Sequence, residues 1–235
     1  MTVALERDGA VAFLRMDRPE TLNAFDAPMV DRMREQVAAL CADGSLRAAV
    51  LCGAGRSFCT GVDVKGLGAG EIDLAWFRDW HRMTLELERI EIPLVAAVQG
   101  HCLGGGLMLT LAADYRIAAD DLRIGLGAVR HGILPGSAPL RLADVVGSVQ
   151  ARRLCLFGEY VDAAEALRIG LVDRVVLASE LEGAARALAE RAASFPPRAL
   201  RELKQLLRGA PSLDDSAYEA AYLAAQDRCL DEGES

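Results

Sequence analysis

Three consecutive glycines, Gly104–Gly106, lie between a short apolar run and a helix-like segment. The run before them, Pro93–Val98, has the composition of a strand buried in a parallel sheet. The segment after them, Leu107–Ala113, has the pattern of a buried helix. Glycines in the first turn of this helix would leave backbone N–H groups without a partner and let a ligand oxygen approach closely. The pattern predicts either a site that holds negative charge or a tight turn whose glycines serve only helix packing.

The segments before the glycines alternate between strand-like and helical patterns. Val3–Arg7 and Val11–Met16 flank an Asp-Gly turn and indicate a β-meander. A helix is predicted over Ala27–Cys41, with Asp26 in a position to cap its first turn. The apolar run Ala48–Cys52 then predicts a second strand. This order of strand, helix and strand is typical of a right-handed parallel crossover.

The region that follows contains a stretch without clear periodicity. Phe58–Gly70 carries four glycines and predicts a functional or mobile loop. Trp76–Ile90 has an amphipathic pattern that predicts a helix. Further along, the patterns predict a strand pair at Tyr115–Ala118 and Leu122–Gly125, a turn-rich stretch at Gly132–Pro139, short helices at Arg141–Val145, Gln150–Phe157 and Ala163–Ile169, and a strand at Leu171–Val176.

From Glu180 onward the patterns are helical only. Helices are predicted at Leu181–Ala193, Arg198–Leu207 and Leu213–Cys229, and prolines mark the breaks between them. We therefore expect an α/β core over residues 1–178 and an all-helical region over residues 179–235.

Composition excludes several classes of protein. The 26 Lys and Arg residues against 34 Asp and Glu residues give a net charge of -8, which offers no support for a nucleic-acid partner. No apolar run approaches the roughly 20 residues of a membrane span, and the N-terminus lacks the layout of a signal peptide, so we expect a cytoplasmic protein. The six cysteines form no C-x-x-C pair and no cluster with histidine, so neither a metal site nor a disulfide framework is predicted.

Four segments in order and spacing resemble the crotonase (enoyl-CoA hydratase/isomerase) family: Arg18–Ala24, Gly53–Lys65, Pro93–Gly106 and Gly158–Val175. The resemblance covers nearly the whole chain, and four motifs in register are far more specific than the triple glycine alone. It implies a crotonase-type spiral of ββα units that ends in a helical trimerisation region, assembled as a homo-trimer or as a hexamer of two trimers. It also implies an acyl-CoA ligand, with coenzyme A as part of the substrate and no permanently bound cofactor or metal.

The resemblance also implies roles for individual residues. The family's two oxyanion-hole donors match the backbone N–H groups of Val62 and Gly105. Two such donors stabilise the enolate oxygen of a thioester, and the loss of one typically costs on the order of a hundredfold or more in rate. The same matching places these further residues along the substrate: Asn23, Ala24, Phe58, Gly61, Asp63, Lys65, Gly104, Met108 and Ala128. Lys65 would either meet the phosphates of CoA or be solvated, and Asp63 would either meet CoA or cap a turn.

The sequence departs from the family at the two positions that carry glutamates in its hydratases. One of these positions lies one helical turn after the oxyanion glycine and is Met108 here. The other is matched by Ala128, and no Asp or Glu occurs between Asp121 and Asp144. Methionine and alanine side chains transfer no protons. The sequence therefore argues against conventional hydration and against an isomerase that uses a single glutamate.

Other side chains are candidates for the missing proton transfer. His131 lies in the loop that normally bears the second glutamate. His81 matches a histidine of the family's dehalogenase branch, but the nucleophilic aspartate of that branch would fall near Gly136 and is absent. Each histidine has the alternative of a structural or surface role. Weaker candidates are His101, Asp144 and Cys59.

The end of the chain differs from the family as well. Family members commonly continue past a segment such as Asp231–Gly233 with one more helix, whereas this chain stops at Ser235. We therefore expect an acyl pocket that is either more open or completed by another protomer.

Three interpretations remain open at this stage. The first is an acyl-CoA lyase or isomerase-type enzyme that polarises a thioester carbonyl with Val62 and Gly105; isomerisation, thioester hydrolysis, decarboxylation or weak hydration would fit. The second is a non-catalytic acyl-CoA-binding or carrier protein. The third is an assembly partner of an active relative.

Overall fold

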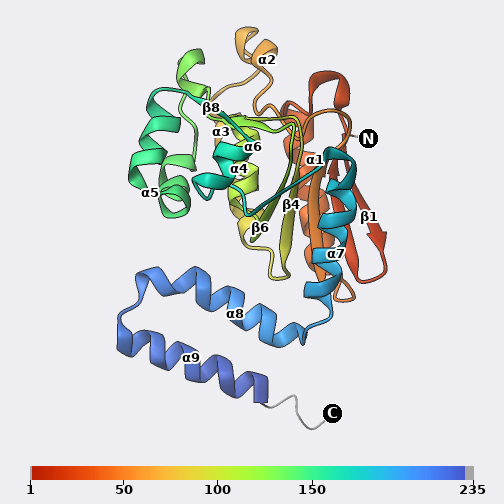
Figure 1. Ribbon diagram of the computed structural model, residues 1–235, viewed down its shortest axis with the longest axis vertical. Coiled ribbons are helices and arrows are strands. Elements are labelled where there is room, and N and C mark those ends of the chain that lie inside the picture. Colours follow the sequence, from red (N-terminus) through yellow and green to blue (C-terminus); the bar gives the residue numbers. More distant parts are fainter. Residues whose placement is uncertain (1, 231–235) are drawn as a thin grey trace.

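The computed structural model describes residues 2–230 and contains a six-stranded sheet (Figure 1). The strand order is β1 (Val3–Asp8), β2 (Val11–Met16), β3 (Ala48–Gly53), β4 (Leu94–Val98), β6 (Tyr115–Ala119) and β9 (Arg174–Val176). The β1–β2 pair is antiparallel and the other pairs are parallel. This confirms the predicted meander followed by parallel crossovers.

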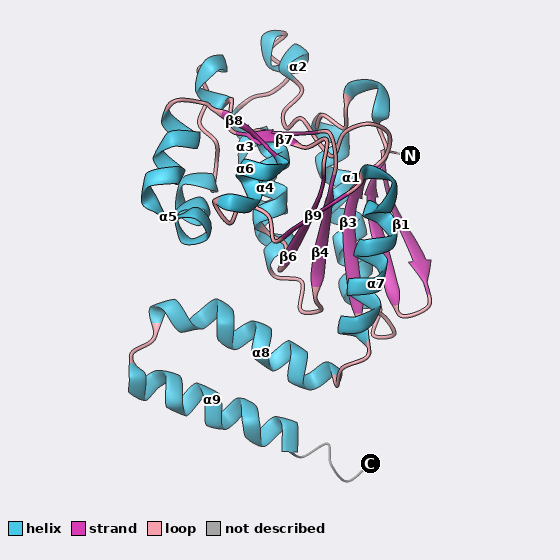
Figure 2. Cartoon of the chain, viewed as in Figure 1, coloured by secondary structure: helices cyan, strands magenta, loops and turns pink. Residues whose placement is uncertain are grey.

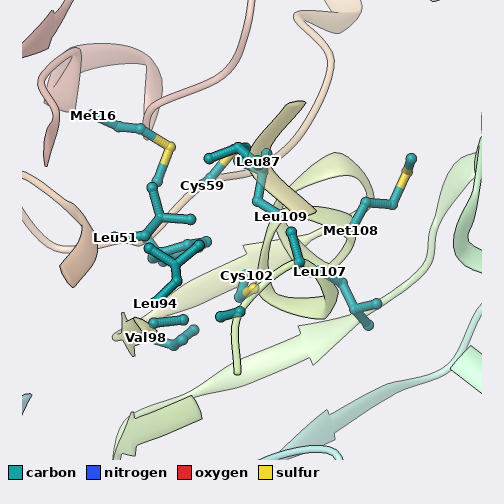
Figure 3. Close-up of a cluster of buried hydrophobic side chains, with 14 of the residues drawn as sticks. Met16, Leu51, Cys59, Leu87, Leu94, Val98, Cys102, Leu107, Met108 and Leu109 are labelled. Atoms are coloured by element: carbon teal, nitrogen blue, oxygen red, sulfur yellow. The ribbon is translucent and has the colours of Figure 1, made fainter. Parts of the chain in front are cut away.

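Successive side chains of each strand point to opposite sides of the six-stranded sheet, and helices cover both of its faces. Leu14, Leu51 and Val98 belong to the larger core, together with side chains of α1 (Ala27–Ala42), α3 (Leu74–Glu88) and α4 (Gly105–Leu111). Figure 3 shows part of this core, in which Leu51, Leu94 and Val98 lie near Leu109 and Cys102. The alternate residues, such as Phe13 and Val50, form a second core with α7 (Leu181–Ala193).

A second sheet begins where β4 ends. Its order is β5 (His101–Leu103), β7 (Arg123–Gly125) and β8 (Tyr160–Asp162), and only Gln99 and Gly100 separate β5 from β4 (Figure 2). The prediction that Tyr115–Ala118 and Leu122–Gly125 pair with each other is wrong. β6 pairs with β4 and β9 in the first sheet, whereas β7 pairs with β5 and β8 in the second.

Two helical segments differ from the sequence prediction. The stretch expected to be irregular contains the short helix α2 (Val64–Gly68), because the carboxylate of Asp63 accepts a hydrogen bond from the Lys65 amide at 3.1 Å and caps it. α5 (Ala138–Leu156) spans two predicted helices, which meet at Gly147 with φ +74°. α6 (Ala163–Arg168) lies where it was expected, and one-turn 3-10 helices occur at Pro19–Thr21, Ala128–His131, Ala178–Glu180 and Ala210–Ser212.

The C-terminal helices divide into two groups. α7 packs on the sheet through Leu181, Ala185 and Ala189. α8 (Pro197–Gly209) and α9 (Asp215–Leu230) pack against each other and extend away from the sheet (Figure 1). Lys204 ties α8 to the core, because its Nζ donates to the Ile92 carbonyl at 2.9 Å and to the Asp114 carboxylate at 2.6 Å.

The segment Asp231–Gly233, where the chain is expected to differ from the family, lies outside the described residues. Within residues 2–230, no helix has the combined length and apolar character that crossing a membrane requires.

Candidate active site

The loop after β3 is held beside β5 as an extra strand-like segment. The Cys59 amide donates to the His101 carbonyl at 3.1 Å, and the Leu103 amide donates to the Cys59 carbonyl at 2.9 Å. These hydrogen bonds place Gly61 against the backbone of Gly105, the first residue of α4. Gly61 has φ +87°, and a Cβ built on it would lie 2.5 Å from the amide nitrogen of Gly105. Glycine at both positions allows the two backbones to touch.

The contact places the amides of Val62 and Gly105 close together. Phe25 forms backbone hydrogen bonds with the residues on either side of Val62. Its amide donates to the Gly61 carbonyl, and its carbonyl accepts from the Asp63 amide. The Val62 N–H therefore points to the other side of the segment. Gly105 is the first residue of α4, so its N–H has no intrahelical acceptor. Within residues 2–230, neither amide donates a hydrogen bond to the protein.

Both amides belong to residues that line a cavity of about 510 Å³. One wall is aromatic and comes from α3: the rings of Trp76 and Trp80 are stacked with centroids 5.4 Å apart, and Phe77 packs edge-on against Trp76. The remaining lining residues are Thr60, Val62, Val64, Leu74, Leu103, Gly104, Gly105, Met108, Gly127, Ala128, His131, Ile133, Leu134, Pro135, Gly136 and Tyr160. The cavity is therefore largely apolar, with backbone amides at one point of its wall.

Among residues 2–230, no carboxylate side chain lines this cavity. Met108 and Ala128, the residues matched to the family's glutamate positions, both lie in its wall. The Met108 side chain points away from Leu109 and Cys102 (Figure 3), and its Cε would lie 2.5 Å from a Cβ built on Gly136. The titratable side chains in the lining are His131 and Tyr160.

Comparison with known proteins settles the family. The family model for enoyl-CoA hydratase/isomerase matches residues 6–230 of this chain. The chain belongs to the enoyl-CoA hydratase/isomerase family. The predicted crotonase resemblance is thereby confirmed.

Individual members of the enoyl-CoA hydratase/isomerase family agree with this assignment. The (E)-benzylidenesuccinyl-CoA hydratase of Thauera aromatica is 36% identical over 209 residues, which cover 87% of this chain and 81% of that protein. The carnitinyl-CoA dehydratase of Proteus mirabilis is 38% identical over 208 residues, which cover 87% and 79%. The crystal structure of enoyl-CoA hydratase from Bacillus anthracis superposes with a TM-score of 0.93 at 27% identity and covers 97% of this chain and 90% of that one. The crotonase-type fold is confirmed.

Three of the residues matched to CoA-binding positions are buried in the fold. The Asn23 side chain has no exposed surface; its Nδ2 donates to the carbonyls of Ser57 at 2.9 Å, Ala54 at 3.0 Å and Phe58 at 3.1 Å. Phe58 is fully buried and Ala24 is 7% exposed. In this enoyl-CoA hydratase/isomerase family member, the Asn23 side chain therefore ties down the loop that precedes Gly61, and Ala24 and Phe58 are buried in the fold.

Of the other residues matched to CoA-binding positions, Gly61 is buried, Asp63 is partly exposed and Lys65 is exposed. Asp63 caps α2, and its carboxylate lies 3.6 Å from the guanidinium of Arg18, which also pairs with Asp26 at 2.8 Å. Lys65 is exposed on α2 beside it. The structure thus confirms the capping interpretation of Asp63 and leaves Lys65 open to solvent.

The remaining candidates for proton transfer fall outside the cavity, apart from His131. His81 is exposed on α3 and does not line it. His101 is exposed and lies 3.3 Å from the Ser57 hydroxyl, and Asp144 is exposed on α5. Cys59 is fully buried, and this burial raises the pKa of its thiol to about 12, so it is not an activated nucleophile.

Sequence reasoning missed two features of the site. The aromatic wall had a signal, since Trp76 and Trp80 are spaced to share one face of a helix. Tyr160 had none, because β8 is short and the residue that Tyr160 pairs with, Gly125 in β7, lies 35 positions earlier in the chain. In the described part of the chain, no three His, Cys, Asp or Glu side chains are grouped so that they could hold a metal ion.

Proposed function

We propose that the cavity binds the acyl group of an acyl-CoA thioester and that the amides of Val62 and Gly105 stabilise its enolate oxygen. The observation that carries this proposal is the pair of free amides, brought together by the Gly61–Gly105 contact at the wall of an apolar cavity. Fixed donors of this kind are among the largest contributions to catalysis of acyl chemistry. Gly104 lies beside them as part of the same wall.

The reaction differs from conventional hydration in this proposal. Hydration by two glutamates requires an acid and a base at the added water. Met108 and Ala128 stand at the matched positions, and the described lining of the cavity holds no carboxylate in their place. Another acyl-CoA reaction that passes through an enolate is therefore favoured, with His131 as one candidate for proton transfer.

The acyl group that fits this site is apolar and flat. Stacked indole rings and the edge of Phe77 form one wall, and aromatic surfaces favour stacking or edge contacts with an aryl or conjugated group. The CoA part would leave the cavity past Gly61 and Asp63 toward α2, where exposed Lys65 can meet a phosphate. Coenzyme A is then part of the substrate, and no permanent cofactor is required.

We further propose that the active form is a homo-trimer or a hexamer of two trimers in the cytoplasm. The α8–α9 pair carries the surface for this assembly. The exposed apolar side chains of these two helices are Leu203, Leu207, Tyr218, Tyr222, Leu223 and Leu230, and Leu213 in the connection between them is exposed as well.

A non-catalytic acyl-CoA-binding or carrier protein is the second candidate. The observation that favours it is again the lining, because an apolar cavity without carboxylates can hold an acyl chain without reacting with it. In that case His131 and Tyr160 would be ordinary polar contacts.

Incubation of the purified protein with enoyl-, malonyl- and aryl-CoA thioesters separates these functions. Turnover is followed by thioester absorbance and free thiol release, and binding is followed by calorimetry. We expect acyl-CoA binding, turnover of at least one thioester and little hydration of crotonyl-CoA. Tight binding without turnover would favour the carrier, ordinary hydration rates would refute the argument from Met108 and Ala128, and absence of binding would overturn the proposal.

A pair of histidine variants tests the role of His131. His131→Ala removes a side chain that lines the cavity, whereas His81→Ala removes an exposed histidine outside it. If His131 transfers a proton, turnover falls in the first variant and is unchanged in the second. Equal turnover in both variants would exclude His131 from the chemistry.

A further inference from the structure

Tyr160 is held in place close to Ala128, the residue matched to the second glutamate of the family's hydratases. The residue lies in β8 opposite Gly125, and the Arg130 guanidinium lies over its ring at 4.8 Å from the centroid. Arg130 is fixed in turn by a 2.7 Å hydrogen bond to the Gly158 carbonyl. The ring also rests on Gly125, where a Cβ would lie 2.7 Å from its Cδ1.

The hydroxyl of Tyr160 reaches the cavity next to Ala128. A Cβ built on Gly127 would collide with the hydroxyl oxygen, so the oxygen lies against the backbone one residue before Ala128. Tyr160, Gly127 and Ala128 all line the cavity. Tyr160 is partly exposed, and within residues 2–230 its hydroxyl makes no hydrogen bond to the protein, so the hydroxyl is available to a molecule in the cavity.

We propose that Tyr160 is the catalytic acid of this site and that it protonates the α-carbon of the enolate held by Val62 and Gly105. The inference rests on the proposed function, because it requires a thioester enolate in the cavity. A tyrosine hydroxyl is a proton donor at neutral pH and is a poor base. The reaction must therefore generate the enolate without removing a proton from carbon.

Decarboxylation of an α-carboxy acyl thioester, that is a malonyl-type thioester, meets this requirement. The bond between the α-carbon and the carboxylate breaks, CO₂ leaves, and the electron pair of that bond forms the enolate. The α-carbon then bonds to the proton of the Tyr160 hydroxyl, and water returns a proton to the phenolate. The net reaction consumes one proton and releases one CO₂ for each thioester, and it needs no oxidant or metal.

The rest of the lining suits the same reaction. A substrate carboxylate in this cavity would meet mainly apolar and aromatic side chains, and in the described part of the chain no Lys or Arg side chain lines the cavity to stabilise it. Removing the charge from water into such surroundings is costly, whereas CO₂ is neutral. Loss of CO₂ therefore removes the desolvation penalty that the substrate carboxylate incurs on binding.

The test uses Tyr160→Phe, which keeps the ring and its contacts and removes only the hydroxyl. Tyr115→Phe is the matched control, since Tyr115 lies in β6 and packs with the second core. Decarboxylation of malonyl-CoA and of aryl-substituted malonyl thioesters is measured by CO₂ release, and the Kd of a saturated acyl-CoA is measured by calorimetry. We expect kcat to fall about 10²–10⁴-fold in Tyr160→Phe with an unchanged Kd, and neither to change in the control.

A second variant tests the role of the Tyr160 hydroxyl independently, in case Tyr160→Phe folds poorly. Gly127→Ala places a methyl group where the hydroxyl lies, and Gly127 has φ -97°, which alanine adopts readily. We expect a loss of kcat in this variant and no additional loss when it is combined with Tyr160→Phe. Binding without decarboxylation, or decarboxylation that survives both variants, would overturn the role of Tyr160 and leave the proposed function standing. Absence of acyl-CoA binding by the unaltered protein would overturn both.

Discussion

Gly61 and Gly105 touch through their backbones, although 43 residues separate them in the chain. A Cβ on Gly61 would lie 2.5 Å from the Gly105 nitrogen, and a Cβ on Gly105 would lie 3.0 Å from the Gly61 Cα. The separation of the two candidate oxyanion donors is therefore set by the absence of side chains at these two positions.

Gly61→Ala should disrupt the site. The added methyl group meets the Gly105 backbone, and φ +87° is strained for alanine, so we expect a destabilisation of about 1–3 kcal/mol and weaker acyl-CoA binding. Gly68→Ala is the control, because a Cβ there meets nothing within 4 Å. Urea unfolding and calorimetry measure both effects. Equal behaviour of the two variants would contradict the contact.

Gly105→Pro should remove one donor while keeping α4, since proline is tolerated at the first position of a helix. Its Cβ would lie 2.7 Å from Cζ2 of Trp80, so Gly105→Ala is needed as the control that carries the same clash and retains the N–H. We expect turnover in the proline variant to be about 10²–10³-fold below that in the alanine variant. Equal turnover would refute Gly105 as a donor.

Asn23→Ala should destabilise the whole loop that carries Gly61. It leaves the carbonyls of Ala54, Ser57 and Phe58 without their side-chain donor, and each buried group left unsatisfied costs about 1–3 kcal/mol. Thr21→Ala removes one bond, at 3.1 Å to the Arg18 carbonyl, and should cost about 1 kcal/mol. Urea unfolding compares the two. A loss below 1 kcal/mol in Asn23→Ala would show that the network is not needed.

The buried thiols should be inert in the folded protein. Burial raises the pKa of Cys59 and of Cys52 to about 12. At pH 8, iodoacetamide should modify exposed Cys41 first and reach Cys59 and Cys102 only after unfolding, as mass spectrometry can establish. Rapid modification of Cys59 in the folded state would contradict its burial.

The same thiols predict a pH dependence of stability. Their ordinary pKa is 9.0, so between pH 9 and about 12 the folded state retains protons that the unfolded state has lost. The free energy of unfolding should therefore fall as pH rises through this window. Cys59→Ala should show a smaller slope than the unaltered protein when urea unfolding is repeated at each pH.

Local patterns were sufficient for much of the fold. The strands that became β3 and β4 were predicted within a residue or two because they are continuous apolar runs, and α1 was predicted from Asp26 and its apolar spacing. Met108 and Ala128 were placed by the family motifs and do line the cavity. β5 and β8 have three residues each and were missed, whereas the equally short β7 and β9 lie within longer segments that were predicted as strands.

The sequence by itself determined the family, the order of the main elements and the presence of free backbone at Gly104–Gly106, because these depend on residues near one another in the chain. Only the tertiary structure decided that Asn23 is buried, that His81 lies outside the cavity and that Tyr160 lies inside it. These outcomes depend on which face of a helix or strand meets a distant segment, and that is set by packing between elements far apart in the chain.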